Sequence, residues 1–336
     1  MRWMVGGIVV AAGCAVGWSA TAQMAAAPNY VAARQVSGVI RIWGSPQMGN
    51  LLKLYEVGFR AVQPRVLFEN DLKSTITAVA GVYTGRAEIG LLGREIWPVE
   101  KQAFESVKGH PPRVVDVATG SYDVPKATFA LMVFVPRTNP MTSISMVQLA
   151  RVFGGDPSNA IRTWGELGLK GEWAQRPIDL YGFSRENDKA QIFNKLVFEK
   201  GGTWDCRLRE FGNAPDGTDA GDLIVRAIER DPDAIGISNV HYARSGVRAL
   251  AISTKEHAEP VAPLKANVTN RSYPLSRAVY MVANRDTNEV TAEFLRFVLS
   301  RQGQEAVARE GSYLPLTGET ARKELRELSG GPEFSP

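Results

Sequence analysis

The 336-residue sequence is poor in the residues that build metal centres and disulfide frameworks. Its two cysteines exclude a framework of several disulfides and any zinc or iron–sulfur site that needs several cysteines. Its three histidines, His110, His241 and His257, lie far apart and show no metal-ligand spacing. We therefore expect a protein that holds no metal and no other cofactor.

Long runs of charge of one sign are also absent. The 39 basic and 35 acidic residues give a formal net charge of +4, and charged residues make up 22% of the chain against 44% hydrophobic residues. These are values of a globular chain, and they exclude a disordered or collagen-like one. The small positive charge favours anionic partners weakly and carries no nucleic-acid signature, so no nucleic-acid partner is expected.

Familiar catalytic motifs are missing as well. The sequence contains no Gly-x-Ser-x-Gly elbow, no His-Glu-x-x-His helix and no phosphate-binding P-loop. The carboxylates of Asp71 and Asp123 have no obvious histidine partner, and a histidine placed like His241 is more often a surface or core-edge residue. A hydrolase would need a pair of nucleophile and base, and none can be named. We interpret the chain as non-enzymatic.

Only the N-terminus carries a hydrophobic run that approaches the length of a membrane span. The run from Trp3 to about Ala20 follows a basic start, and Ala20-Thr21-Ala22 offers the small-x-small pattern that signal peptidase recognises. A membrane anchor is the alternative reading of a run this long. We predict a signal peptide over residues 1–22 and a protein that is exported, to the periplasm or beyond.

The predicted export would remove one of the two cysteines and leave the other in the mature protein. Cys14 lies inside the signal peptide, in Ala11-Ala12-Gly13-Cys14, which resembles a poor lipoprotein box. The apolar residues that continue after Cys14 argue against lipidation there. Removal of the signal peptide leaves Cys206 as the only cysteine, so no intramolecular disulfide is expected.

From Val39 onward, short apolar strands alternate with amphipathic helices, which is typical of an α/β protein with largely parallel sheets. Strands are expected at 39–43, 66–68, 87–92, 114–118, 129–135, 178–183, 234–238 and 278–283. Helices are expected from Pro46 to about 59, from Ser74-Thr75 to 83, at 99–107, from a Ser145-x-x-Gln148 capping box to 153, from Asp188, and at 222–230, 290–299 and 302–309.

Two strands, 129–135 and 278–283, are nearly all apolar, and they suggest a division of the chain into two lobes. The expected division consists of hinge crossings at 129–136 and 272–283, lobe 1 at 36–128 plus 284–328, lobe 2 at 137–271, and a disordered tail at 329–336. Two consecutive domains with one linker are the simpler alternative, and the pattern alone leaves both open.

Hydroxyl side chains follow the strands at three expected strand-to-helix turns. Such turns meet at the carboxyl edge of a sheet, where helix N-termini offer N–H groups and a partial positive charge. Hydroxyls and N–H groups solvate an oxyanion, and an arginine adds a fork suited to phosphate or carboxylate. Each serine alone is commonly just a helix cap. Together they predict a converging site for a small oxyanion, made of Ser45, Ser74, Thr75, Arg94, Ser184 and Arg185.

An ordered series of short segments covers about the whole mature chain. It includes Ile42-Trp43-Gly44-Ser45, Ala87-Glu88-Ile89-Gly90 with Arg94 after it, 133–140, 148–155, 163–168, 234–237, 273–277, Gly303-Gln304 and 311–316. No single segment is specific, but their order and spacing resemble the phosphate-binding protein family of ABC importers, in the periplasmic solute-binding superfamily (type II).

The resemblance implies a two-lobed fold with two hinge crossings and a ligand cleft between the lobes. It implies an exported, monomeric solute-binding protein that captures a small oxyanion, phosphate first, for an ABC permease. The alternative is a non-transporting relative that binds another ligand or acts as a sensor or interaction module.

The family's anion site would fall on Ser45, on Ser74-Thr75, on the loop at Arg94 and on the turn at Ser184-Arg185. This last turn departs from the family, in which an arginine is followed closely by Ser-Gly-Thr. Here the residues are Arg185-Glu186-Asn187-Asp188-Lys189-Ala190. We expect the Asp188 carboxylate to cap the helix that follows and to repel a dianion.

Overall fold

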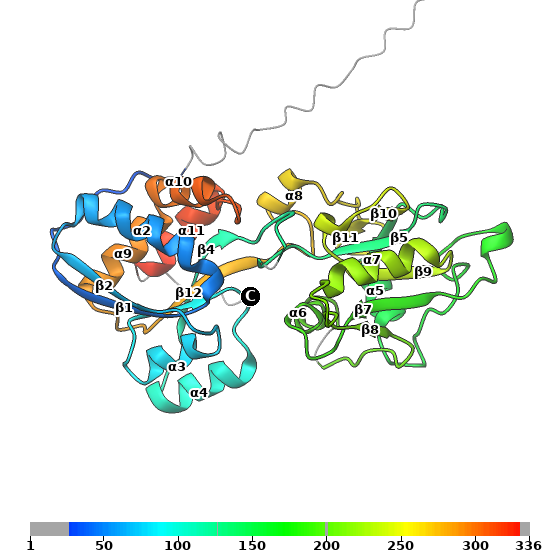
Figure 1. Ribbon diagram of the computed structural model, residues 1–336, viewed down its shortest axis with the longest axis horizontal. Coiled ribbons are helices and arrows are strands. Elements are labelled where there is room, and N and C mark those ends of the chain that lie inside the picture. The colour runs from blue at the N-terminus through cyan, green and yellow to red at the C-terminus, as the bar shows by residue number, and fades with distance from the viewer. Residues whose placement is uncertain (1–26, 126, 199–200, 330–336) are drawn as a thin grey trace, which may run out of the picture.

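The computed structural model describes residues 27–125, 127–198 and 201–329, which form two lobes side by side (Figure 1). Each lobe is an α/β unit built on one five-stranded sheet, so the expected two-lobed α/β fold is confirmed. The predicted signal peptide, Cys14 and nearly all of the expected tail lie outside the described residues. Among the residues described, no helix combines the length and hydrophobicity that a membrane crossing requires.

Lobe 1, as we use the term from here, is built on the sheet with strand order β2-β1-β3-β12-β4. β1 runs parallel to β2 and β3, whereas β12 runs antiparallel to both β3 and β4, so the sheet is mixed. In the same order, the strands span Val66–Asp71, Gly38–Gly44, Ile89–Leu92, Ala278–Ala283 and Arg113–Thr119.

Helices cover both faces of this sheet because its central strands are apolar on both sides. Leu91 packs in the core cluster that includes α2, α9 and α10, and its neighbour Leu92 packs against α3 and α4 (Figure 1). The first face carries α2 (Gly49–Val62), α9 (Glu289–Leu299), α10 (Arg301–Glu310) and α11 (Gly318–Leu328), and the second carries α3 (Thr77–Tyr83) and α4 (Pro98–Lys108).

Lobe 2 is built on the sheet with strand order β10-β5-β9-β7-β8. β7 runs parallel to β8 and β9, and β5 runs antiparallel to β9 and β10. The five strands span, in order, Val247–Ala249, Met132–Pro136, Ala234–Ser238, Asp179–Phe183 and Arg209–Phe211. A small parallel pair, β6 (Ser143–Ser145) and β11 (Ala251–Ser253), lies beside them.

Three of the four helices of lobe 2, α5, α6 and α7, begin at a polar side chain that accepts a backbone N–H of the first turn. The predicted capping box is confirmed, because Ser145 Oγ accepts a hydrogen bond from the Gln148 N–H at 3.1 Å and Gln148 Oε1 accepts one from the Ser145 N–H at 2.9 Å. The helices are α5 (Met146–Phe153), α6 (Asp188–Val197), α7 (Ala220–Arg230) and α8 (Lys265–Thr269), with short 3-10 turns at Gly171–Trp173 and Val240–Tyr242.

The two apolar strands expected within the hinge crossings are strands of the sheets. β5 lies in the sheet of lobe 2 and β12 in the sheet of lobe 1, where both find cover for two apolar faces. The chain therefore passes between the lobes over 120–131 and 270–277. These two segments are bonded to each other: the Gly120 N–H donates to the Arg277 carbonyl at 2.8 Å, and the Leu131 N–H donates to the Leu275 carbonyl at 3.0 Å.

The helix α11 was not predicted, because its sequence is largely polar. It nevertheless packs Ala321 into the core of lobe 1 and buries Glu324 against β4, where Glu324 Oε2 accepts the Asp116 N–H at 3.1 Å. Burial, together with the nearby Asp116 carboxylate, raises the pKa of Glu324 to about 7. An ionised Glu324 therefore destabilises the folded state.

This buried carboxyl makes the stability of lobe 1 depend on pH. Because folding raises the pKa of Glu324 from 4.5 to about 7, the free energy of unfolding should fall as the pH rises through that window. Glu324→Gln keeps an oxygen to accept the Asp116 N–H but cannot ionise. Above pH 7 we expect the variant to exceed the wild type by on the order of 3 kcal/mol, and near pH 4.5 to match it. Urea unfolding at both pH values measures the difference, and an equal difference at both would contradict the assignment.

Candidate functional site

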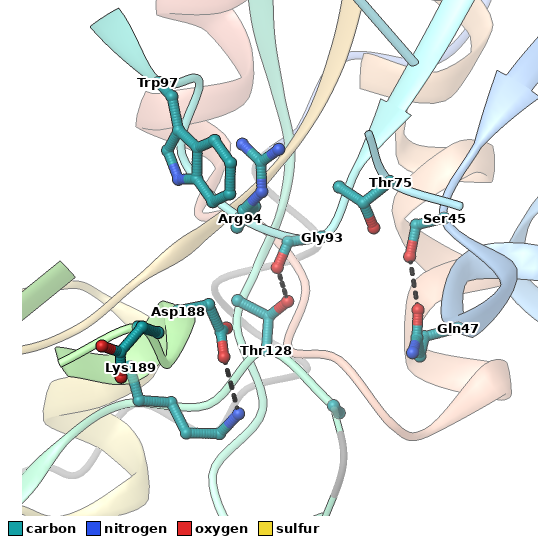
Figure 2. Close-up of a pocket in the computed structure, with 11 residues that line it drawn as sticks. Ser45, Gln47, Thr75, Gly93, Arg94, Trp97, Thr128, Asp188 and Lys189 are labelled. Atoms are coloured by element: carbon teal, nitrogen blue, oxygen red, sulfur yellow. Dashed lines mark hydrogen bonds and ion pairs between the residues drawn. The ribbon is translucent and has the colours of Figure 1, made fainter. Parts of the chain in front are cut away.

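A cavity of about 300 Å³ lies between the two lobes (Figure 2). Pockets for small molecules begin at about this size. Lobe 1 and the first crossing contribute Ser45, Gln47, Thr75, Gly93, Arg94, Trp97, Ala127 and Thr128, and lobe 2 contributes Glu186, Asp188 and Lys189. Of the six residues predicted for the site, Ser45, Thr75 and Arg94 line this cavity.

Ser45 follows β1 directly and is almost fully buried. Its N–H donates to the Leu91 carbonyl at 3.0 Å, which fixes the turn against the neighbouring strand β3. Pro46 begins a short 3-10 turn, Pro46–Met48, rather than the expected α-helix, and the Ser45 side chain makes no capping bond. Instead, Ser45 Oγ donates to Gln47 Oε1 at 2.7 Å at the cavity wall (Figure 2).

Gly93 brings two hydroxyl groups together. A Cβ atom at this position would lie 3.2 Å from Ser45 Oγ and 3.3 Å from Thr128 Oγ1, and Thr128 Oγ1 itself donates to the Gly93 carbonyl (Figure 2). The absence of a side chain thus leaves room for both hydroxyls at one wall of the cavity. Sequence reasoning missed Gly93 and Thr128, and the signal for Gly93 was its place directly after the buried strand β3.

Thr75 and Ser74 take different positions relative to the cavity. Thr75 lines the cavity, whereas Ser74 does not. Ser74 makes its hydrogen bonds within its own turn. Its side-chain Oγ accepts the Ile76 N–H at 3.3 Å, and its backbone carbonyl accepts a hydrogen bond from Thr77 Oγ1 at 2.7 Å. α3 begins only at Thr77, so the turn before it is longer than expected.

Arg94 is held in place by its own lobe. Its two Nη atoms donate to the two carboxylate oxygens of Glu100, at 2.8 and 2.7 Å, and its guanidinium lies 3.8 Å from the ring centroid of Trp97. Figure 2 shows this stacking at the edge of the cavity. The positive charge of Arg94 is therefore balanced within lobe 1, and the residue orients the wall rather than adding a free charge.

Ser184 and Arg185 do not reach the cavity, in contrast to their predicted role. The exposed Arg185 pairs with Glu210 of β8 through Nε and Oε1 at 2.8 Å, and its N–H donates to Glu210 Oε2 at 2.9 Å. The Ser184 N–H donates to the Phe211 carbonyl at 3.0 Å. The start of this turn is thus bonded to the edge strand β8, and Glu186 and the first turn of α6 face the cavity instead of Ser184 and Arg185.

The first turn of α6 supplies Asp188 and Lys189. Asn187, not Asp188, caps the helix, because Asn187 Oδ1 accepts the Lys189 N–H at 3.0 Å. Asp188 Oδ1 pairs with Lys189 Nζ at 2.9 Å, and Asp188 Oδ2 lies 3.8 Å from Arg277 Nη1. Burial by itself would raise the pKa of Asp188, but Lys189 and Arg277 outweigh it and hold this pKa below its usual range. Asp188 is therefore ionised at neutral pH.

Arg277, which the sequence analysis did not single out, joins the two lobes next to the cavity. It lies in the second crossing with its side chain almost fully buried. Its Nη2 pairs with Glu95 Oε2 of lobe 1 at 3.1 Å, while Nη1 faces Asp188 of lobe 2. The loop that carries Arg94 and the start of α6 thus share one buried cation.

The charged side chains that line the cavity balance one another. Arg94 and Lys189 contribute two positive charges, and Glu186 and Asp188 contribute two negative ones. An anion in this cavity would be held by individual donors rather than by excess positive charge. The Thr75 hydroxyl and the Lys189 ammonium line the cavity, and the hydroxyls of Ser45 and Thr128 would donate to an anion after turning away from Gln47 Oε1 and the Gly93 carbonyl.

Comparison with known proteins agrees with this architecture. The model of the family described as the PBP superfamily domain matches residues 30–302. Over 335 residues the chain is 30% identical to the phosphate-binding protein PstS of Pseudomonas aeruginosa, with 97% of this chain and 98% of that protein covered.

Solved structures show the same fold. PstS from Borrelia burgdorferi matches with a TM-score of 0.58 at 15% identity, covering 84% of this chain and 100% of that one. A possible phosphate-binding protein from Planctomyces limnophilus matches with a TM-score of 0.53 at 20% identity, covering 88% and 99%. The chain therefore belongs to the PBP superfamily and, within it, to the family of the phosphate-binding protein PstS.

Proposed function

We propose that the protein is an exported binding protein that captures phosphate between its lobes and delivers it, as a monomer, to an ABC permease. The observation that carries the proposal is the gathering of the Ser45, Thr75 and Thr128 hydroxyls in one cavity that both lobes line. The relative from Pseudomonas aeruginosa, which covers nearly the whole chain, is a phosphate-binding protein by name.

The carboxylate of Asp188 favours an oxyanion that still carries a proton. An ionised carboxylate can only accept hydrogen bonds, so it pairs with a ligand O–H and repels a bare oxygen of a fully ionised anion. Phosphate keeps at least one proton at neutral pH, whereas sulfate keeps none. The pairing of Asp188 with Lys189 and Arg277 reduces the repulsion expected for a dianion.

Capture fits a hinge motion of the lobes. The cavity walls belong to different lobes, and the two crossings that connect the lobes are short and bonded to each other. Closing the lobes would desolvate the anion and strengthen each hydrogen bond to it, and a permease would then recognise the closed form. The proposal includes no chemical step on the ligand, so the protein acts as a carrier and not as an enzyme.

Calorimetric titration of the mature protein with phosphate and with sulfate tests the proposal. We expect phosphate to bind at least tenfold more tightly than sulfate, which corresponds to about 1.4 kcal/mol. Gly93→Ala should weaken phosphate binding by at least about tenfold, because the added Cβ would lie 3.2 Å from Ser45 Oγ and 3.3 Å from Thr128 Oγ1.

Gly212→Ala is the matched control, because a Cβ there meets nothing within 4 Å and should leave phosphate affinity unchanged. Absence of heat from phosphate would overturn the proposal. Equal losses in both glycine variants would remove the Gly93 wall from the site.

Two basic residues of the same segment should differ in their effect on binding. Lys189→Met removes an ammonium that lines the cavity and leaves Asp188 with less compensation, so we expect phosphate affinity to fall about tenfold or more. Arg185→Met removes a side chain that pairs with Glu210 outside the cavity, so the affinity should change by less than about twofold. Calorimetry on both variants measures the contrast, and a larger loss in the Arg185 variant would return that residue to the site.

A further inference from the structure

A second cavity adjoins the candidate anion site. It also measures about 300 Å³ and lies between the lobes, with Ile96, Trp97 and Pro98 on the side of lobe 1 and Ile192 and Phe198 on the side of lobe 2. Its walls differ in character from those of the first cavity, because these five side chains present carbon surface where the first cavity presents hydroxyls. The polar side chains of Glu95, Gln191, Asn194 and Lys195 also line the second cavity.

The two cavities adjoin along shared residues. Arg94, Trp97 and Asp188 line both of them. The Trp97 ring has the Arg94 guanidinium over one face at 3.8 Å and remains about a third exposed, at 36%. A ligand with its oxyanion in the first cavity would therefore pass Trp97 to place a substituent in the second.

The apolar wall of lobe 2 is fixed by packing. The Phe198 ring lies 5.0 Å from the ring of Trp204 and 6.0 Å from that of Phe193, measured between centroids. Ile192 is buried in the same core. Such an aromatic cluster keeps its shape when a ligand arrives, so the lobe 2 wall of the second cavity is fixed by core packing and is not made of loose side chains.

The combined size exceeds what an inorganic oxyanion requires. Phosphate has only five heavy atoms, and one cavity of about 300 Å³ accommodates it. Two such cavities in contact reach well into the range of roughly 300–1,000 Å³ that holds small organic ligands. An alkyl or aryl group suits the carbon-lined half, because transfer of apolar surface out of water is favourable.

We infer that the cleft accepts monoesters of phosphate and phosphonates with a small apolar substituent, with the oxyanion in the first cavity and the substituent in the second. The inference rests on the proposed function, because it uses the same oxyanion site. Trp97 marks the passage between the two halves, and the carbon walls of Ile192 and Phe198 select the substituent.

A homologous series of alkylphosphonates, from methyl to butyl, tests the inference by competition against phosphate in calorimetry. Each methylene that enters the second cavity should tighten binding by up to about fourfold, so we expect butylphosphonate to bind at least about tenfold more tightly than methylphosphonate. A flat or falling series, with phosphate still binding, would overturn the inference and leave the proposed function in place. Absence of binding by phosphate and by every phosphonate would overturn both.

A matched pair of variants locates the effect. Gln191 is exposed and lines the second cavity but not the first, so Gln191→Trp should fill the second cavity and abolish the gain along the series. Its affinity for phosphate should stay within about twofold of the wild type. Gln102→Trp, at an exposed position of α4 that lines neither cavity, should retain the full gain. A gain that survives Gln191→Trp would place the substituent elsewhere and contradict the assignment.

Discussion

The buried side chain of Arg277 is the constraint on which the arrangement of the cleft depends. It lies in the second crossing, and its guanidinium pairs with Glu95 of lobe 1 at 3.1 Å and faces Asp188 of lobe 2 at 3.8 Å. Loss of one partner from a buried ion pair costs about 3–5 kcal/mol, because the remaining charge is left uncompensated in a medium of low dielectric. The Arg277 guanidinium therefore links the loop that carries Arg94 to the first turn of α6 at the second crossing.

This arrangement determines how the cleft can discriminate between ligands. Arg277 and Lys189 compensate Asp188, and Glu100 compensates Arg94, so the cavity has both donors and carboxylate acceptors but no surplus of positive charge. Selection then depends on the number and the protonation of the ligand oxygens. Three residues that line this cavity, Arg94, Trp97 and Asp188, also line the second cavity. The contacts that fix their side chains therefore shape both halves of the cleft.

Local signals in the sequence were sufficient for most of the fold, and three of the six residues predicted for the site line the cavity. β12 coincides with the apolar run at 278–283, and the capping box at Ser145 forms as expected. Ser45 directly follows β1, and Arg94 follows β3 with only Gly93 between, so both reach the cavity. Arg185 does not line the cavity, because it pairs with Glu210. This residue belongs to the short edge strand β8, which the sequence pattern did not predict. Thr128 and Arg277 lie in irregular crossings, where residue spacing carries no information about position in space.

A crystal structure of the protein with arsenate, an anion with the shape and charge of phosphate, tests the central claim most directly. The anomalous scattering of arsenic locates the anion independently of the protein density. We expect a single peak within hydrogen-bonding reach of Ser45 Oγ, Thr75 Oγ1 and Lys189 Nζ, with the protonated oxygen toward Asp188. A peak beside Arg185 and Glu210, or anywhere else outside the cavity between the lobes, would contradict it.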